Sequence, residues 1–73
     1  KSYDIEFLWK EPVASAQLEL QIGATIETLS VPNNSDTAFL ENISIPDGEQ
    51  TLSAKVLKGS RNATPYHIIL HQL

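Results

Sequence analysis

The side chains that could do acid–base or metal chemistry are two histidines and a few carboxylates. His67 and His71 stand four residues apart. In a strand this spacing puts both imidazoles on one face but about 13 Å apart at ~3.3 Å per residue, too far to share a zinc ion. We expect packed or solvated histidines, with pH sensing or metal binding as the alternative. Asp4 and Glu6 share the outward face of one strand, where solvation explains them better than general acid–base work.

Oxygen ligands and nucleophiles are equally sparse. The loop Asn33–Asp36 and the residue Asp47 carry oxygens of the kind that calcium prefers, but no spaced acidic loop ends in a bidentate glutamate. Serines are scattered without a nucleophile elbow, and Ser–His–acid roles cannot be assigned. The chain has no cysteine, which excludes disulfides and thiolate zinc sites. The sequence therefore predicts no catalytic residue, no metal and no cofactor.

Two aromatic residues are the strongest candidates for a binding role. Trp9 continues an alternating apolar series that begins at Tyr3, which favours packing in the core. The alternative is an exposed platform for the apolar face of a sugar ring. Tyr66 follows Pro65 at the start of a strand. It is either a structural residue or an aromatic at the rim of a site.

The elements that must position these residues are short strands. Tyr3, Ile5, Phe7 and Trp9 fall on every second position, the period of a strand with one buried face. Turn residues separate this run from similar ones, and no segment keeps a helical period. The expected strands are Ser2–Lys10, Ala16–Ile22, Ala24–Val31, Thr37–Ile45, Glu49–Leu57 and Tyr66–Leu73. We predict an all-β fold, an antiparallel β-sandwich of jelly-roll or immunoglobulin-like type with about five to six strands.

Three local features refine this prediction. Glu11-Pro12 should end the first strand, because proline removes a ladder donor. The apolar alternation slips near Glu27-Thr28, which indicates a β-bulge there. Pro46-Asp47-Gly48 is a turn signal that predicts a hairpin between the fourth and fifth strands. The predicted core residues are Ile5, Phe7, Leu18, Leu20, Ile22, Phe39, Ile43, Leu52, Ala54, Val56 and Ile69.

Length and composition limit the remaining choices. The 73 residues suffice for a single domain spanning 1–73, and they also suit a fragment of a larger module. The net charge of −4 repels a phosphate backbone, so no nucleic-acid partner is predicted. No apolar run approaches the ~18 residues of a membrane helix. The absence of methionine favours a processed product or an excised domain, and the absence of cysteine favours a bacterial origin or a larger assembly.

Asparagines that begin an Asn-x-Ser/Thr sequence occur at Asn33, Asn42 and Asn62. Each is a formal acceptor for glycosylation, which needs an exposed side chain and a secretory route. Ser and Thr are common in strands and loops, so coincidence is the preferred interpretation.

The order of three segments resembles a known kind of module. Tyr3–Phe7 opens with Tyr-x-Ile, Ala16–Gly23 contains Leu-x-Leu-x-Ile-Gly, and Ser44–Leu52 contains Pro-x-Gly followed by Gln-Thr-Leu. This succession resembles the carboxyl-terminal part of the non-catalytic β-sandwich modules appended to bacterial polysaccharide-degrading enzymes, notably alpha-L-fucosidases and sulfatases. It is also similar to galactose-binding-like, jelly-roll carbohydrate-binding modules. Such modules are usually longer, with further strands before the Tyr-x-Ile strand.

The resemblance implies a non-catalytic accessory or carbohydrate-binding module of a secreted, periplasmic or cell-surface enzyme. Its partners would be a glycan or the catalytic domain of a parent chain. The alternative is a structural immunoglobulin-like spacer or adhesion module of a bacterial surface protein. The residues proposed for sugar binding, chosen for their aromatic character or loop position, are Trp9 and Tyr66 as platforms, with Glu11, Asn33, Asn34, Asp36 and Arg61 as polar contacts.

Overall fold

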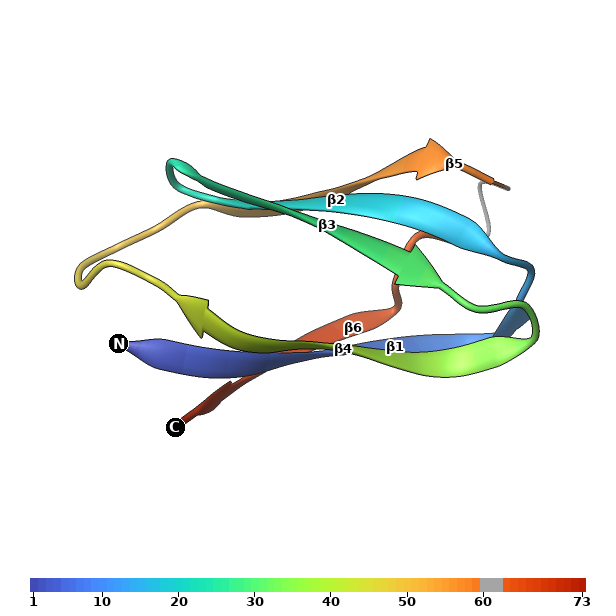
Figure 1. Ribbon diagram of the computed structural model, residues 1–73, viewed down its shortest axis with the longest axis horizontal. Helices are drawn as coiled ribbons and strands as arrows, with labels where there is room; N and C mark the ends of the chain where they lie inside the picture. The colour runs from blue at the N-terminus through green and yellow to red at the C-terminus, as the bar shows by residue number, and fades with distance from the viewer. Residues whose placement is uncertain (60–62) are drawn as a thin grey trace.

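Two antiparallel three-stranded sheets face each other in the molecule (Figure 1). The computed structural model describes residues 1–59 and 63–73. One sheet has the order β4-β1-β6 and the other the order β3-β2-β5. The predicted all-β sandwich is therefore confirmed. The strands are β1 (Ser2–Val13), β2 (Ala16–Ile22), β3 (Thr25–Val31), β4 (Ser35–Ser44), β5 (Leu52–Lys58) and β6 (His67–Gln72).

Most consecutive strands lie in different sheets, so the chain crosses from one sheet to the other between them. The exception is the pair β2 and β3, which are neighbours in one sheet and form a hairpin. Its turn is Gly23-Ala24, between the paired residues Ile22 and Thr25. Gly23 has a φ of 58°, a conformation that costs glycine little. Its N–H donates to the Thr51 carbonyl at 3.0 Å. The Gln50 side chain fills the place of a Cβ at Gly23, so the turn also anchors the chain just before β5.

The predicted hairpin at Pro46-Asp47-Gly48 is wrong, because the strands on either side of this turn belong to different sheets. β4 pairs with β1, whereas β5 pairs with β2. A turn signal indicates where the chain changes direction but does not determine which strand it then joins. Here the contact between Thr51 and Gly23 directs the chain to the second sheet, and β5 begins at Leu52 rather than Glu49.

β1 is the central strand of its sheet and is longer than predicted. It continues through Pro12 to Val13, and its register against β4 shifts between Leu8 and Val13. Pro12 lies in this irregular stretch, where no regular ladder donor is required of it. The Val13 carbonyl then accepts a hydrogen bond from the Asn34 N–H at 2.7 Å, which holds the β3–β4 turn against the end of β1.

The predicted β-bulge at Glu27-Thr28 is wrong, and a bulge lies instead in β4. The pairing of β2 with β3 is continuous, and Ile26 simply points outward with 54% exposure. In β4 two residues, Glu41 and Asn42, stand opposite Asp4 alone. Asn42 has a φ of 55°, and its N–H donates to Asp4 Oδ1 at 2.9 Å. This extra residue reverses which face the following side chains occupy.

The core lies between the sheets and contains most of the residues predicted from alternation. Ile5, Phe7, Leu18 and Leu20 are at most 1% exposed. Further buried residues were missing from the predicted core list, although core packing was the favoured alternative for Trp9. They are Val13, Ala16, Leu29, Val31, Ala38, Ile45 and Ala63, together with Trp9.

Three predicted core residues are exposed instead. Phe39 is 51% exposed and Ile69 is 40% exposed, because both stand opposite Glu6 on the outer face of the β4-β1-β6 sheet. The bulge in β4 puts Phe39 and Ile43 on opposite faces, although their spacing is even. Leu52 pairs with the buried Ile22 and faces inward, but it opens the edge strand β5 and keeps 38% exposure.

These positions predict very different losses of stability when two phenylalanines on neighbouring strands are replaced by alanine. Phe7→Ala removes a fully buried ring and should cost about 3–5 kcal/mol in the free energy of unfolding. A core in a domain below about 80 residues rarely supplies more than ~3–5 kcal/mol, so this variant should be largely unfolded. Phe39→Ala should cost less than about 1 kcal/mol. Urea denaturation followed by circular dichroism measures both, and equal costs would contradict the position of the bulge.

Candidate functional site

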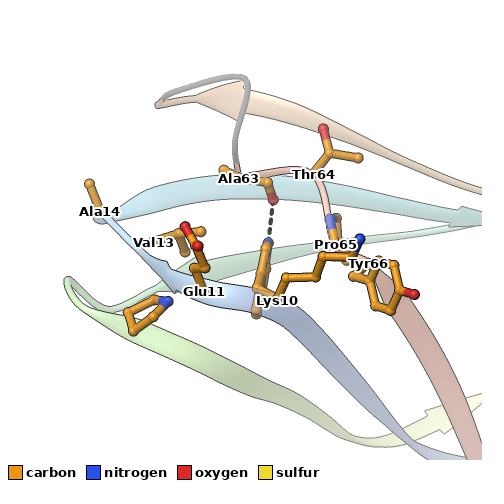
Figure 2. Close-up of a pocket in the computed structure, with 10 residues that line it drawn as sticks. Lys10, Glu11, Val13, Ala14, Ala63, Thr64, Pro65 and Tyr66 are labelled. Atoms are coloured by element: carbon orange, nitrogen blue, oxygen red, sulfur yellow. Dashed lines mark hydrogen bonds between the residues drawn. The ribbon is translucent and has the colours of Figure 1, made fainter.

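A pocket of about 620 Å³ opens at the end of the sandwich where β1 leaves its sheet (Figure 2). One wall is the irregular end of β1 with the link to β2, and the other is the segment that leads into β6. Residues more than 50 positions apart in the sequence therefore meet here. The lining consists of Trp9, Lys10, Glu11, Pro12, Val13, Ala14, Ala63, Thr64, Pro65 and Tyr66.

Trp9 forms the buried base of this pocket and links its two walls. Only 7% of the residue is exposed, and its ring stacks near that of Phe7 with 6.5 Å between centroids. The indole N–H donates to the carbonyl of Ala63 at 2.7 Å, the dashed line in Figure 2. Trp9 is therefore a core residue, the interpretation that its place in the alternating series favoured. An inward-facing indole needs an acceptor, but nothing in the sequence identifies Ala63 as that acceptor.

Tyr66 is the exposed aromatic residue of the pocket, at 56% exposure. Its backbone N–H donates to the Leu8 carbonyl at 2.7 Å, which holds the residue beside β1. The Lys10 ammonium lies 4.4 Å from the centroid of its ring, and the His67 ring meets it edge-on with 4.3 Å between centroids. The structure thus places Tyr66 at a rim, one of its two predicted alternatives.

Lys10 is the site residue that the sequence analysis missed. The alternating pattern of β1 placed it on the outward face, where lysine is unremarkable. Its significance comes from Tyr66, whose position depends on the long-range pairing of β6 with β1. No local signal connects two residues so far apart in the chain. The nearest sequence signal, Glu11-Pro12, predicted only that the first strand ends there.

Of the polar residues predicted for sugar binding, one lines the pocket and the others do not share its position or lie outside the described residues. Glu11 lines the pocket with Trp9 and Tyr66. Asn33, Asn34 and Asp36 belong to the β3–β4 turn and the start of β4 and are not among the lining residues. All three are exposed, and Asn34 adopts a φ of 62° while its N–H reaches β1. Arg61 and the formal acceptor Asn62 lie outside the described residues.

The two histidines lie on the outer face of the β4-β1-β6 sheet and are not among the residues that line the pocket. His71 Nε2 and Glu6 Oε1 are 3.0 Å apart, whereas His67 packs against Tyr66. Within residues 1–59 and 63–73, no three His, Cys, Asp or Glu side chains gather closely enough to hold a metal ion. In the same residues, no helix has the length and apolar character needed to cross a membrane.

A second hollow of about 360 Å³ lies at the other end of β1. Its lining includes Lys1, Tyr3, Leu52 and Leu70, along with the turn around Asp47. Its one aromatic residue, Tyr3, is partly buried and packs against the core. The pocket beside Tyr66 is therefore the better candidate for binding a ring-shaped ligand.

Comparison of the chain with protein-family models, with curated proteins and with solved structures found no match. The functional interpretation therefore depends on the geometry of the pocket and on the sequence resemblance described above.

Replacing Trp9 by phenylalanine tests its role as the link between the two walls. Trp9→Phe keeps an aromatic ring but leaves the buried Ala63 carbonyl without its donor. The expected loss is about 1–3 kcal/mol in the free energy of unfolding. Amide hydrogen exchange should accelerate at Tyr66 more than in the β2–β3 hairpin. Equal acceleration in both regions would mean that the bond stabilises the domain generally and does not fasten this segment.

Proposed function

We propose that the chain is a non-catalytic carbohydrate-binding module, an accessory part of a secreted polysaccharide-degrading enzyme. The observation that carries the proposal is the exposed ring of Tyr66 at the rim of a pocket that also offers an ammonium and a carboxylate. The resemblance of the strand and turn motifs to accessory modules of bacterial carbohydrate-active enzymes supports the same assignment. A glycan is the ligand in this proposal, and the catalytic domain of a parent chain is the neighbour.

Binding would use both the apolar C–H groups and the polar hydroxyl groups of a sugar ring. The C–H groups of a pyranose stack on an aromatic ring, and the hydroxyl groups exchange hydrogen bonds with charged side chains. Tyr66 supplies the ring, Glu11 supplies acceptor oxygens and Lys10 supplies donors. The Lys10 ammonium covers part of the Tyr66 ring, but over half of the residue remains accessible, at 56%. The walls are fixed by backbone and indole hydrogen bonds, so little ordering is needed on binding.

The absence of a catalytic arrangement among the described residues agrees with a binding role. The carboxylate of Glu6 faces His71 on the outside of the sheet and lines neither pocket. Glu11 is the carboxylate of the pocket lining, so hydrolysis by a pair of carboxylates has no second member among those residues. We infer that any chemistry on the glycan is done by the catalytic domain of the parent enzyme, in the periplasm, at the cell surface or outside the cell.

Tyr66→Ala tests this function with little risk to the fold, because the side chain is mostly exposed. Amide NMR titrations against plant, host and sulfated oligosaccharides should show saturable shifts clustered at residues 9–11 and 63–66. The variant should bind at least about ten-fold more weakly, the effect of losing roughly 1.4 kcal/mol of stacking. Phe39→Ala, which removes an exposed aromatic from the outer face of a sheet, is the matched control and should bind sugar like the unmutated chain.

A folded chain that shows no shift with any sugar would contradict the proposal. The structural alternative would then apply: an immunoglobulin-like spacer or adhesion module that presents its neighbours. Binding that survives Tyr66→Ala but is lost in Phe39→Ala would retain a sugar-binding function and reject this pocket as its site.

A further inference from the structure

We propose that the pocket beside Tyr66 selects acidic glycans, whose carboxylate or sulfate group contacts the Lys10 ammonium. This inference rests on the proposed function and names the ligand class of the same pocket. The geometry that carries it is the position of Lys10 Nζ, 4.4 Å from the centroid of the Tyr66 ring and at the lining of the pocket.

The Lys10 ammonium lacks a carboxylate partner in the described part of the chain. The ion pairs found there join Lys55 to Glu19 at 3.9 Å and His71 to Glu6 at 3.0 Å. Lys10 is exposed and takes part in neither pair. Its charge is therefore directed at an aromatic face and at the solvent of the pocket, where a ligand would lie.

The contact with the Tyr66 ring positions the Lys10 ammonium but does not give its N–H donors a hydrogen-bond acceptor. An ammonium carries three N–H donors, and a ring face engages it through electrostatic attraction to the π system. At an exposed position this attraction is weaker than a charge-assisted hydrogen bond to an anionic oxygen. An anionic group on a sugar stacked against Tyr66 would therefore meet these donors beside the ring. Confinement of the long lysine chain beside the ring reduces the entropy lost on binding.

The acidic character of the protein does not cancel this local cation. The chain carries a net charge of −4, but at physiological ionic strength charges are screened beyond about 8 Å. Glu11 is the acidic residue of the lining. Figure 2 shows the Lys10 side chain running to Tyr66 while the Glu11 side chain points away from it. We therefore expect the anionic group on the Tyr66 side of the pocket and neutral hydroxyl groups near Glu11.

Uronic acids and sulfated sugars offer the same chemistry, so the experiment uses a matched pair for each. Trigalacturonate is compared with its neutral methyl ester, and a sulfated galactose trisaccharide with its desulfated form. Isothermal titration calorimetry and amide NMR at low salt measure the affinities. The anionic member of at least one pair should bind about three- to ten-fold more tightly, and added salt should reduce this preference.

Variants then assign the preference to Lys10. Lys10→Met keeps the aliphatic stem and should bring the anionic ligand down to the affinity of its neutral partner. Lys10→Arg keeps the charge and the contact with the ring, so the preference should remain. Lys55→Met loses the same charge on the outer face of the other sheet and serves as the matched control. Glu11→Gln removes the nearby negative charge and should raise the affinity for anionic ligands.

The outcomes separate this inference from the proposed function. A preference for the anionic member that disappears in Lys10→Met and survives in Lys55→Met supports the inference, and the pair that shows it names the source of the anion. Equal binding of charged and neutral members, or a preference unchanged in Lys10→Met, overturns the inference and leaves carbohydrate binding intact. No binding by any of the four sugars, in a chain whose NMR spectrum shows that it is folded, overturns the inference. If the wider oligosaccharide panel also gives no shifts, the proposed function is overturned as well.

Discussion

The hydrogen bond from the Trp9 indole to the Ala63 carbonyl is the constraint on which the pocket and the last strand depend. It spans 54 positions of the sequence, is buried and measures 2.7 Å. The backbone bond from the Tyr66 N–H to the Leu8 carbonyl assists it. Together they determine where the returning chain meets β1 and hence the register that pairs Leu8 with His67. Without that register, Tyr66 would have no defined position relative to Lys10.

This arrangement makes one side chain serve both the core and the site. The chain contains no cysteine, so no disulfide limits the entropy of its unfolded state. Its stability must come from a small apolar core and from well-satisfied polar groups, and no buried side-chain polar atom of the described residues lacks a partner. Trp9 contributes to both, because its ring packs beside Phe7 while its N–H satisfies a buried carbonyl. The rigid wall of the pocket is thus an extension of the core.

Alternation alone was enough to predict the strands, the two-sheet architecture and much of the core. One error in the predicted core arose where a single residue changed the phase of the alternation. Asn42 inserts into β4 in a left-handed conformation, so Phe39 and Ile43 face opposite sides despite their even spacing. Asparagine tolerates such a conformation, but it is also common in ordinary loops and turns, so its type did not identify the bulge. In the last strand, three consecutive apolar residues, Ile68 to Leu70, gave the period no polar contrast from which to choose a face.

The hairpin error has a related physical cause. Pro46-Asp47-Gly48 contains good turn residues, and Gly48 does adopt a positive φ of 97°. Turn chemistry determines the local path of the chain, whereas the partner of the next strand depends on contacts with residues distant in sequence. The Gly23 N–H donates to the Thr51 carbonyl, and this bond helps to align β5 with β2. That contact joins two turns that are distant in sequence, so the residues around Pro46 alone do not reveal it.

The same distinction between local and long-range information explains the candidate site. The sequence alone suggested Trp9 and Tyr66 for their aromatic character and Glu11 for its loop position. It did not suggest Lys10, which is distinguished by its short distance to the Tyr66 ring on the segment that leads into β6. The Asn33–Asp36 loop is the opposite case. Its composition suited sugar binding, but it does not line the pocket, and the Asn34 backbone holds the β3–β4 turn to Val13. Ligand-binding character in this small sandwich therefore follows from which loops the core brings together at the Trp9 end, more than from the polarity of any one loop.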